Sequence, residues 1–454
     1  MSARHHVIVG AGLAGALLAL LLARRGHRVD VFERRPDQRI RGYEGGRSIN
    51  LALARRGLAV LEAAGLGDAV LRRAVAMRGR QVHPLGGPEA FLPYGRSDAE
   101  CIWSVHRGRL NHLLLDAAEA AGARLHFHHR LGLVDFDARR AEIIDDRDRH
   151  ARWIDFDALL GADGAGSALR NAMQGHADLH PEITPLDHGY KELEIPPDAE
   201  GGFRIVRDAL HIWPRGGFML IALPNTEGTF TATLFLPHKG RTPDFESVET
   251  ADEARRFFEA TFPDALALMP RFEEDWISHP TSSLATLRLR HWHLDRRAVL
   301  LGDAAHAMVP FHGQGMNCAF EDVEALDRLM AANADLAEAF AAFEVERKPN
   351  AEAIQAMALE NYVEMRDAVD DPAWRLQRTL ELQLAERHPE RFVPRYSMVS
   401  FRRTPYALAF ERGRWQRALL AGATAGRDGL DGLDWAAIDA RILAELPPLP
   451  ADAA

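Results

Sequence analysis

The stretch Val7-Ile8-Val9-Gly10-Ala11-Gly12-Leu13-Ala14-Gly15 decides the fold of this chain. An uncharged run of strand length stops at a glycine, and a helical pattern then extends from Leu13 to Arg25. The run predicts a buried parallel strand, a tight turn and a helix packed on the strand. In this G-x-G-x-x-G arrangement, Gly10 makes the turn, Gly12 lets the backbone approach a pyrophosphate, and Gly15 lets helix and strand pack closely.

A second strand follows this helix at Val29-Asp30-Val31-Phe32 and ends at Glu33. An acidic residue about twenty positions after the glycines is typical of a dinucleotide-binding βαβ unit, where it binds ribose hydroxyls. The uncharged run from Val7 to Ala23, behind Arg4, also has features of a signal peptide. The glycines inside that run and the strand after it favour the dinucleotide fold.

Composition and charge narrow the class of protein. A length of 454 residues is enough for several domains, and 47% hydrophobic with 26% charged residues is ordinary for a globular protein. A net charge of −10 without a basic tract gives no reason to expect nucleic acid as a partner. Cys101 and Cys318 stand far apart, without Cys or His at ligand spacing. We therefore expect no disulfide framework and no metal site, and a reducing cytoplasm fits.

Two later stretches repeat the strand-turn-helix pattern with an aspartate in the turn. Leu159 to Arg170 contains Asp163-Gly164, and Val299 to Asn317 contains Gly302-Asp303. Turns of this kind bring backbone N–H groups and a fixed carboxylate to a polar cofactor. Between the first and second of the three turns, a glycine-rich polar loop from Gly42 to Leu53 replaces the regular βα units that a NAD dehydrogenase would have there.

The middle and the end of the chain have different patterns. From Gly189 to Pro237, extended segments alternate with Pro and Gly turns, which predicts a sheet able to cover a cofactor and wall a pocket. Helices are predicted from Val248 to Thr261, Asn317 to Ala332 and Asp335 to Ala368, the last broken or kinked at Pro349. After Arg387 nothing approaches the roughly eighteen apolar residues of a membrane span, so we expect a soluble, cytoplasmic protein without a membrane anchor.

The three nucleotide-type turns, near residues 10, 163 and 303, resemble those of the flavoprotein aromatic hydroxylases. Longer strings resemble the kynurenine 3-monooxygenase family within that group, roughly from Val7 to Tyr406. These strings are Gly46-Arg47-Ser48-Ile49-Asn50-Leu51-Ala52-Leu53, Pro93-Tyr94-Gly95, His211-Ile212-Trp213-Pro214, Leu301-Gly302-Asp303-Ala304-Ala305-His306, Gly313-Gln314-Gly315-Met316-Asn317 and Asn361-Tyr362-Val363-Glu364-Met365-Arg366.

The resemblance implies an α/β fold: a Rossmann-like FAD-binding domain with an inserted β-sheet substrate domain and a C-terminal helical region. We expect the FAD-binding domain at residues 1–180 and 291–340, the substrate domain at 181–290 and the helical region at 341–454. It also implies hydroxylation of L-kynurenine to 3-hydroxykynurenine in tryptophan degradation. O2, NADPH as co-substrate and non-covalent FAD would be used, with the oxygen carried by a flavin C4a-hydroperoxide. The sequence leaves the oligomeric state open.

The resemblance also implies the cofactor contacts. Besides the glycines of the first turn, the residues expected to contact FAD are Leu13, Glu33, Arg34, Arg35, Ala52, Arg107, Leu131, Asp303, Met316 and Asn317. Arg107 would offset pyrophosphate charge, and Asp303 would bind ribityl or ribose hydroxyls. The N–H groups of Met316 and Asn317 would meet the pyrimidine end of the flavin. The alternative for Arg107 is a surface arginine at a helix start.

For the substrate, the resemblance implies a clamp on the carboxylate and an apolar wall. Arg80, Tyr94, Asn361 and Tyr396 would form the clamp, since a guanidinium binds a carboxylate through two hydrogen bonds. Arg78 competes with Arg80, because alternate residues of one strand share a face. The residues expected to line the pocket are Leu210, Ile221, Leu223, Phe235, Pro310, Phe311 and His312, and those on the strands have the alternative of filling a core.

Two histidines and two further functions remain as alternatives. His306 and His312 invite a general-base interpretation, but flavin-borne oxygen insertion needs no protein nucleophile, metal or triad, so we interpret both as loop or pocket-lining residues and expect no catalytic side chain. The alternative functions are hydroxylation of a phenol or a substituted kynurenine, and flavin oxidoreductase activity without oxygen insertion.

Overall fold

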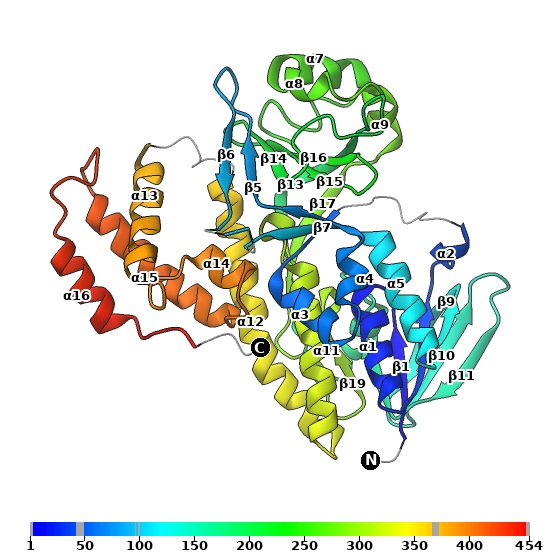
Figure 1. Cartoon of the computed structure of the whole chain (residues 1–454). Helices are drawn as coiled ribbons and strands as arrows, with labels where there is room; N and C mark the ends of the chain where they lie inside the picture. Colours follow the sequence, from blue (N-terminus) through cyan, green and yellow to red (C-terminus); the bar gives the residue numbers. More distant parts are fainter. Residues whose placement is uncertain (1–2, 42–49, 96, 99, 366–371, 451–454) are drawn as a thin grey trace.

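The structure is a computed structural model that describes residues 3–41, 50–95, 97–98, 100–365 and 372–450. Most of the glycine-rich loop expected from Gly42 to Leu53 lies outside the described residues, as does Arg366. In the described part, sheets occupy the centre and one side of the molecule, and the last helices extend from the opposite side (Figure 1).

The stretch that decides the fold forms the centre of a six-stranded sheet with the order β18-β19-β12-β1-β2-β8. Neighbours are parallel except β18 and β19. The strands are β1 (His5–Val9), β2 (Arg28–Glu33), β8 (Arg124–Phe127), β12 (Ala158–Gly161), β18 (His293–Leu294) and β19 (Ala298–Leu300). Helix α1 (Leu13–Arg24) packs against α5 (Arg107–Ala120) and α11 (Gly315–Ala332). The predicted βαβ opening is confirmed.

Glycine is required at the turn between β1 and α1. Gly10 has a φ of +97°, and a Cβ atom there would lie 2.6 Å from the carbonyl oxygen of Ala162. A Cβ atom at Gly15 would lie 2.0 Å from the carbonyl oxygen of Gly10. Any side chain would therefore separate α1 from the strands that it covers.

A seven-stranded sheet stands beside the first, with the order β17-β13-β16-β15-β14-β5-β6. Its strands are β5 (Gly79–Val82), β6 (Ala90–Pro93), β13 (Glu182–Ile195), β14 (Ala209–Pro214), β15 (Met219–Pro224), β16 (Phe230–Pro237) and β17 (Ser282–Arg288). Most come from the expected substrate domain, but β5 and β6 come from the segment expected to bind the cofactor. Helices α7 (Ala251–Thr261), α8 (Pro263–Leu266) and α9 (Phe272–Ser278) cover the outer face (Figure 1).

Two smaller sheets and several short helices complete this part. The small sheets are β3 (Asn50–Leu53), β7 (Ile102–His106) and β4 (Ala74–Met77), and β9 (His129–Asp135), β10 (Arg140–Asp145) and β11 (Ala151–Asp155). The short helical elements are α2 (Gln38–Arg41), α3 (Arg55–Ala63), α4 (Gly67–Leu71), α6 (Ala168–Met173), α10 (Asp303–His306) and the 3-10 turn η1 (Pro310–His312).

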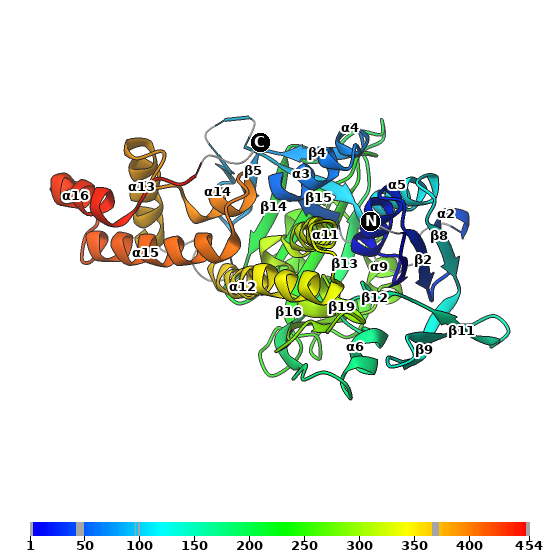
Figure 2. The same cartoon turned by 90° about the horizontal axis from the view of Figure 1, so that it is seen from below.

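The C-terminal region is helical, as predicted, and Figure 2 shows it extending from α12. Its helices are α12 (Leu336–Val363), α13 (Pro372–Arg387), α14 (Arg395–Ser400), α15 (Tyr406–Thr424) and α16 (Trp435–Glu445). Of the expected break or kink at Pro349, the break is absent, because α12 continues through this residue. A proline removes the hydrogen bond to the carbonyl four residues earlier, and here that residue is Val345, which is 77% exposed, so water can bind the freed carbonyl.

No helix among the described residues combines the length and apolar character needed to cross a membrane.

Candidate functional site

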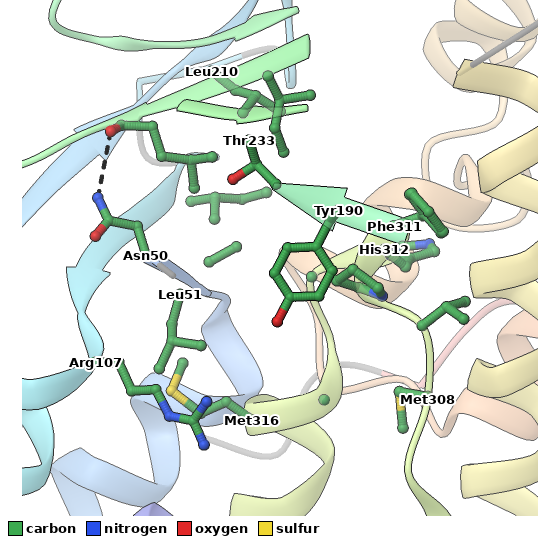
Figure 3. Close-up of a pocket in the computed structure, with 18 of the residues that line it drawn as sticks. Asn50, Leu51, Arg107, Tyr190, Leu210, Thr233, Met308, Phe311, His312 and Met316 are labelled. Atoms are coloured by element: carbon green, nitrogen blue, oxygen red, sulfur yellow. Dashed lines mark hydrogen bonds between the residues drawn. The ribbon is translucent and has the colours of Figure 1, made fainter. Parts of the chain in front are cut away.

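A cavity of about 410 Å³ lies between the first turn of α1, the segment from Leu301 to Met316, and the inner face of the seven-stranded sheet (Figure 3). We call it the main cavity. A smaller side cavity adjoins it and shares Gly12, Leu13 and Arg107 with it. The two cavities together flank the start of α1, from the inner face of the sheet to the end of β2, and an elongated dinucleotide would need this extent.

The backbone at the start of α1 is open to this space. A Cβ atom at Gly12 would meet no other atom within 4 Å, whereas Cβ atoms at Gly10 and Gly15 would collide with backbone. The first N–H groups of a helix have no partner within the helix, and the helix dipole adds positive potential there. Leu13, next in the chain, lines both cavities. The turn thus fits a pyrophosphate.

The side cavity is bordered by charged groups from two elements. Glu33, at the end of β2, accepts hydrogen bonds from the backbone N–H groups of Ala11 at 3.0 Å and of Arg35 at 2.9 Å. These bonds fix its carboxylate beside the turn. Arg107, the first residue of α5, is exposed and has no side-chain partner among the described residues, so its charge is available to a ligand. Arg35 also borders the side cavity, but Arg34 is exposed and borders neither.

Another part of the wall of the main cavity is formed by the Gly302-Asp303 turn and the start of α11. Asp303 lines the cavity and lies exposed in the first turn of α10. Met316 also lines it (Figure 3). Because α11 begins at Gly315, the N–H groups of Met316 and Asn317 have no helical acceptor and can donate to a ligand. Ala52 on β3 lines the cavity as well.

Two expected cofactor contacts differ in the structure. The side chain of Leu131 on β9 is 5% exposed, packs in the main hydrophobic core and reaches neither cavity. The side chain of Asn317 is fully buried and bonds inside the protein. Its amide nitrogen donates to the carbonyls of Ala52 at 2.8 Å and Gly313 at 3.0 Å, and its Oδ1 accepts from Ala54 N–H at 2.9 Å. Asn317 therefore joins α11 to β3, and only its backbone can meet a ligand.

A buried set of charges holds the Gly302-Asp303 turn from behind. Asp322 Oδ2 accepts from Gly302 N–H at 3.1 Å and lies 2.5 Å from Nε2 of His306, while its Oδ1 accepts from Arg347 at 2.8 Å. Although burial raises the pKa of the Asp322 carboxyl, His306 and Arg347 bring it down to about 2. The carboxylate therefore stays charged and keeps the turn in place.

His306 belongs to this support and not to the cavity surface. Ligand atoms of His306, Cys318 and Asp322 lie within 4.8 Å of one another, a geometry that the spacing of the sequence does not reveal. The Arg347 guanidinium, however, donates to Asp322 and lies 3.6 Å from the Cys318 sulfur. A positive charge thus already satisfies this group and disfavours a metal cation.

Three of the four expected clamp residues meet at one end of the main cavity. Arg80 on β5, Tyr94 after β6 and Tyr396 on α14 all line it. The Arg80 guanidinium carbon lies 5.8 Å and 5.2 Å from the ring centroids of Tyr94 and Tyr396, which stack on each other at 5.4 Å. Burial raises the pKa of the Tyr94 hydroxyl well above its usual value, so it remains a hydrogen-bond donor. The Nε atom of Arg80 is buried without a partner.

Asn361 and Arg78 differ from what the sequence suggested. The Asn361 side chain is buried and donates to the carbonyl of Phe311 at 2.5 Å, so it supports the cavity wall and does not line the cavity. Arg78 stands between β4 and β5 and, unlike Arg80, does not line the cavity. Its guanidinium pairs at the surface with Asp208 at 3.0 Å.

The residues expected to form the apolar wall all lie at the surface of the main cavity. Leu210, Ile221, Leu223 and Phe235 all line the main cavity from β14, β15 and β16, and Pro310, Phe311 and His312 line it from η1. His312 stacks on Tyr396 with 5.6 Å between ring centroids. Burial, with smaller contributions from neighbouring arginines, lowers the pKa of His312 to about 3, so the ring is neutral near pH 7. A neutral, enclosed histidine fits the lining role.

Several lining residues escaped the sequence interpretation. Tyr190 on β13, with Thr231 and Thr233 on β16, lines the same face as Phe235. The sequence could have indicated the two threonines, because the period of two along β16 places residues 231, 233 and 235 on one face. Met219, Leu284 and Met365 complete the apolar surface.

The fold and the two joined cavities define a flavoprotein with a dinucleotide-binding α/β domain. In agreement, residues 5–358 match the protein family described as FAD binding domain. The chain therefore binds FAD, and the glycine turn, Glu33, Arg107 and Asp303 are the groups that the geometry offers to it.

Curated relatives extend over nearly the whole chain. A kynurenine 3-monooxygenase of Stenotrophomonas maltophilia (strain K279a) is 60% identical over 442 residues, which are 97% of this chain and 97% of the relative. One of Xanthomonas campestris pv. campestris (strain 8004) is 59% identical over 99% of this chain and 98% of its own. The chain belongs to the kynurenine 3-monooxygenase family.

Solved structures share the fold at lower identity. A tetrameric form of 2-methyl-3-hydroxypyridine-5-carboxylic acid oxygenase superposes with a TM-score of 0.64 at 20% identity, covering 83% of this chain and 96% of that one. The structure of P. aeruginosa PqsL in complex with 2-aminobenzoylacetate gives a TM-score of 0.66 at 23% identity, covering 81% and 97%.

Proposed function

We propose that this chain is an FAD-dependent monooxygenase that uses NADPH and O2 to convert L-kynurenine to 3-hydroxykynurenine. The observation that carries the proposal is the combination, in one cavity, of a flavin-side turn and an arginine without a carboxylate partner. The curated relatives, at about 60% identity over the full chain, act on the substrate that their name states.

The substrate is an amino acid that carries an aryl ketone, and its carboxylate needs a fixed cation. Arg80 supplies this cation, with the hydroxyls of Tyr94 and Tyr396 beside it as further donors. Among the described residues no carboxylate lies within ion-pair distance of Arg80, so its charge remains available to the ligand. Asn361 contributes by holding Phe311 in the cavity wall.

The aromatic ring needs a dry, shaped surface. Leu210, Ile221, Leu223 and Phe235 provide it, and Phe311 closes the side next to Tyr362, with ring centroids 4.1 Å apart. Exclusion of water matters because bound FAD supplies the oxygen-activating chemistry, which water would divert to hydrogen peroxide. No described side chain is required as a nucleophile.

On the cofactor side, we assign the groups by what each can bind. The backbone at Gly12 and Leu13, with the Arg107 guanidinium, would hold the pyrophosphate, and Glu33 would hold the ribose hydroxyls. Asp303 would bind the ribityl chain, and the N–H groups of Met316 and Asn317 would bind the flavin pyrimidine.

The experiment is oxidation of NADPH by the purified holoenzyme, with and without L-kynurenine, followed by the mass of the product. We expect slow oxidation without substrate, strong acceleration by L-kynurenine, and a product heavier by one oxygen atom that becomes heavier by two further mass units when ¹⁸O2 is used. Acceleration without oxygen in the product would identify an oxidoreductase that does not insert oxygen. Equal rates with and without L-kynurenine would contradict the proposal.

A further inference from the structure

Two hydroxyl groups interrupt the apolar surface of the main cavity. Tyr190 on β13 and Thr233 on β16 both project into it (Figure 3). Neither hydroxyl has a hydrogen-bond partner among the described residues. Thr231, on the same face of β16, differs because its hydroxyl oxygen accepts from the amide nitrogen of Asn225 at 3.2 Å. The two free hydroxyls therefore offer polar contacts that only a ligand can use.

The strand register fixes how these two groups stand relative to each other. Strands β13 and β16 are antiparallel, and Tyr190 lies directly opposite Phe235, two residues from Thr233. Tyr190 and Thr233 are thus diagonal neighbours on one face, about 7–8 Å apart at their backbones. Thr233 is 3% exposed, so its hydroxyl is held close to the sheet, whereas the Tyr190 ring reaches farther into the cavity (Figure 3).

The proposed substrate has two polar groups beside its ring that the carboxylate clamp does not reach. In a 2-aminoaryl ketone, one N–H of the amine bonds internally to the ketone oxygen. The second N–H of the amine and the second lone pair of the ketone oxygen remain free. They point outward, on opposite sides of this internal bond. Partners for both would stand up to about 8 Å apart, since three hydrogen-bond lengths of about 2.8 Å separate them. Two hydroxyls at different heights above one face of the sheet, as on a tyrosine and a threonine that are diagonal neighbours, can serve two such separated groups.

Resting on the proposed function, we propose that Tyr190 and Thr233 determine specificity for the 2-aminoaryl ketone. The Tyr190 hydroxyl donates to the ketone oxygen, and the Thr233 hydroxyl accepts from the ring amine. The assignment follows from chemistry, because a phenol is the more acidic hydroxyl and hence the stronger donor. Together the two bonds fix the rotation of the ring, so that one carbon ortho to the amine always faces the flavin side.

Isosteric variants and matched ligands test this proposal. Thr233→Val and Tyr190→Phe each remove one hydroxyl and little volume. Dissociation constants of the holoenzyme, without NADPH, are measured by calorimetry for L-kynurenine and two analogues. One is 3-benzoylalanine, which lacks the ring amine, and the other is 2-amino-4-(2-aminophenyl)butanoic acid, which lacks the ketone. The ratio of each analogue's constant to that of L-kynurenine measures discrimination for the missing group.

We expect Thr233→Val to lower discrimination for the amine about three- to tenfold and to leave discrimination for the ketone within about twofold. Tyr190→Phe should do the reverse. Thr229→Val is the matched control, because it makes the same change just before β16 at a hydroxyl that accepts from Asn225 at 2.9 Å and does not line the cavity, and it should leave both ratios unchanged. Equal FAD content in all variants shows that the fold is intact.

Ratios that stay at the wild-type value in both variants would overturn the proposal, and exchanged effects would overturn the assignment of donor and acceptor. A change in one variant alone would restrict the role to that residue and exclude the other. These outcomes differ from failure of the proposed function, which would appear as wild-type protein that does not bind or hydroxylate L-kynurenine.

Discussion

A buried pair of arginines and a single buried arginine in this molecule differ in whether a carboxylate balances their charge. Arg56 and Arg347 lie behind the cofactor turn, where Glu321 pairs with both, at 3.0 Å and 3.3 Å, and Asp322 pairs with Arg347 at 2.8 Å. Arg80 lies in the main cavity between two tyrosine rings, without a carboxylate at ion-pair distance among the described residues. Arg56 and Arg347 thus have carboxylate counter-ions at ion-pair distance, and the arginine of the cavity has none there.

The difference helps to distinguish arginines that stabilise the fold from an arginine that binds a ligand. A buried charge without a partner is costly, so it persists where a ligand completes it. The compensated group holds α3, α11 and α12 together and fixes the turn that presents Asp303. The uncompensated group leaves one positive charge facing the cavity, where the substrate carboxylate is proposed to bind.

The largest effect should follow from breaking the compensated group. Glu321→Ala leaves Arg56 and Arg347 short of a counter-charge in the interior, and we expect it to lower the free energy of unfolding by about 3–5 kcal/mol. Glu346→Ala, which removes an exposed partner of Arg328, should cost less than about 1 kcal/mol. Urea unfolding followed by tryptophan fluorescence measures both. Similar losses in the two variants would contradict the distinction.

Removing the uncompensated arginine should affect binding and spare stability. We expect Arg80→Met to weaken L-kynurenine binding by about 1.5–3 kcal/mol, which is on the order of tenfold to a hundredfold, with unchanged FAD content. Arg78→Met is the control, because that guanidinium pairs with Asp208 at the surface and should matter little. A damaging Arg78→Met with a silent Arg80→Met would place the clamp elsewhere.

His312 is neutral near pH 7, so Arg80 remains the cation of the clamp, in contrast to the paired arginines behind the turn. The folded protein protonates His312 near pH 3, because burial lowers its pKa, whereas the unfolded chain does so near its ordinary pKa of about 6.5. The unfolded state therefore binds more protons below about pH 6.5, and the stability present above that pH is lost as the pH falls.

At pH 5 this linkage amounts to about 2 kcal/mol. We expect wild-type protein to lose about that much more unfolding free energy between pH 7.5 and pH 5 than His312→Gln loses. His150→Gln, at an exposed position, should keep the wild-type pH dependence. Parallel profiles for wild type and His312→Gln would show that His312 is protonated alike in both states.

The smallest effect concerns the exposed, unpaired arginine of the cofactor side. Arg107→Met should weaken FAD binding to the apoprotein by about 1 kcal/mol, or roughly fivefold, because solvent screens this charge. L-kynurenine binding at saturating FAD should not change. Arg109→Met is the matched control on the same helix, since Arg109 already pairs with Glu227 at 3.1 Å. Equal FAD affinity in the two variants would remove Arg107 from the cofactor site.

The sequence predicted the parts that depend on local pattern. Val7 to Glu33 specifies a strand, a glycine turn and a helix through rules that act over a few residues, and the turn that contains Asp303 follows from a similar pattern. Arg107 as a cofactor contact came from resemblance. The clamp residues Arg80, Tyr94 and Tyr396 came from resemblance, because they are far apart in the chain and meet only through β5, β6 and α14.

What the sequence missed depends on long-range pairing. The alternation through Arg78 continues across a boundary between two sheets, so periodicity alone could not reveal that its side chain points elsewhere. Tyr190 and Thr233 are brought together by the register of β13 with β16, which no local signal contains. Asn361 and Leu131 were misplaced because partners distant in sequence, the carbonyl of Phe311 and the core, decide where their side chains lie.

The most direct test compares L-kynurenine with kynuramine, its analogue without the carboxylate, on wild-type holoenzyme and on Arg80→Met. If Arg80 is the cation that binds the carboxylate, wild-type protein prefers L-kynurenine, and the substitution reduces this preference about tenfold or more while the dissociation constant of kynuramine changes little. A preference for L-kynurenine that survives Arg80→Met undiminished would contradict the account.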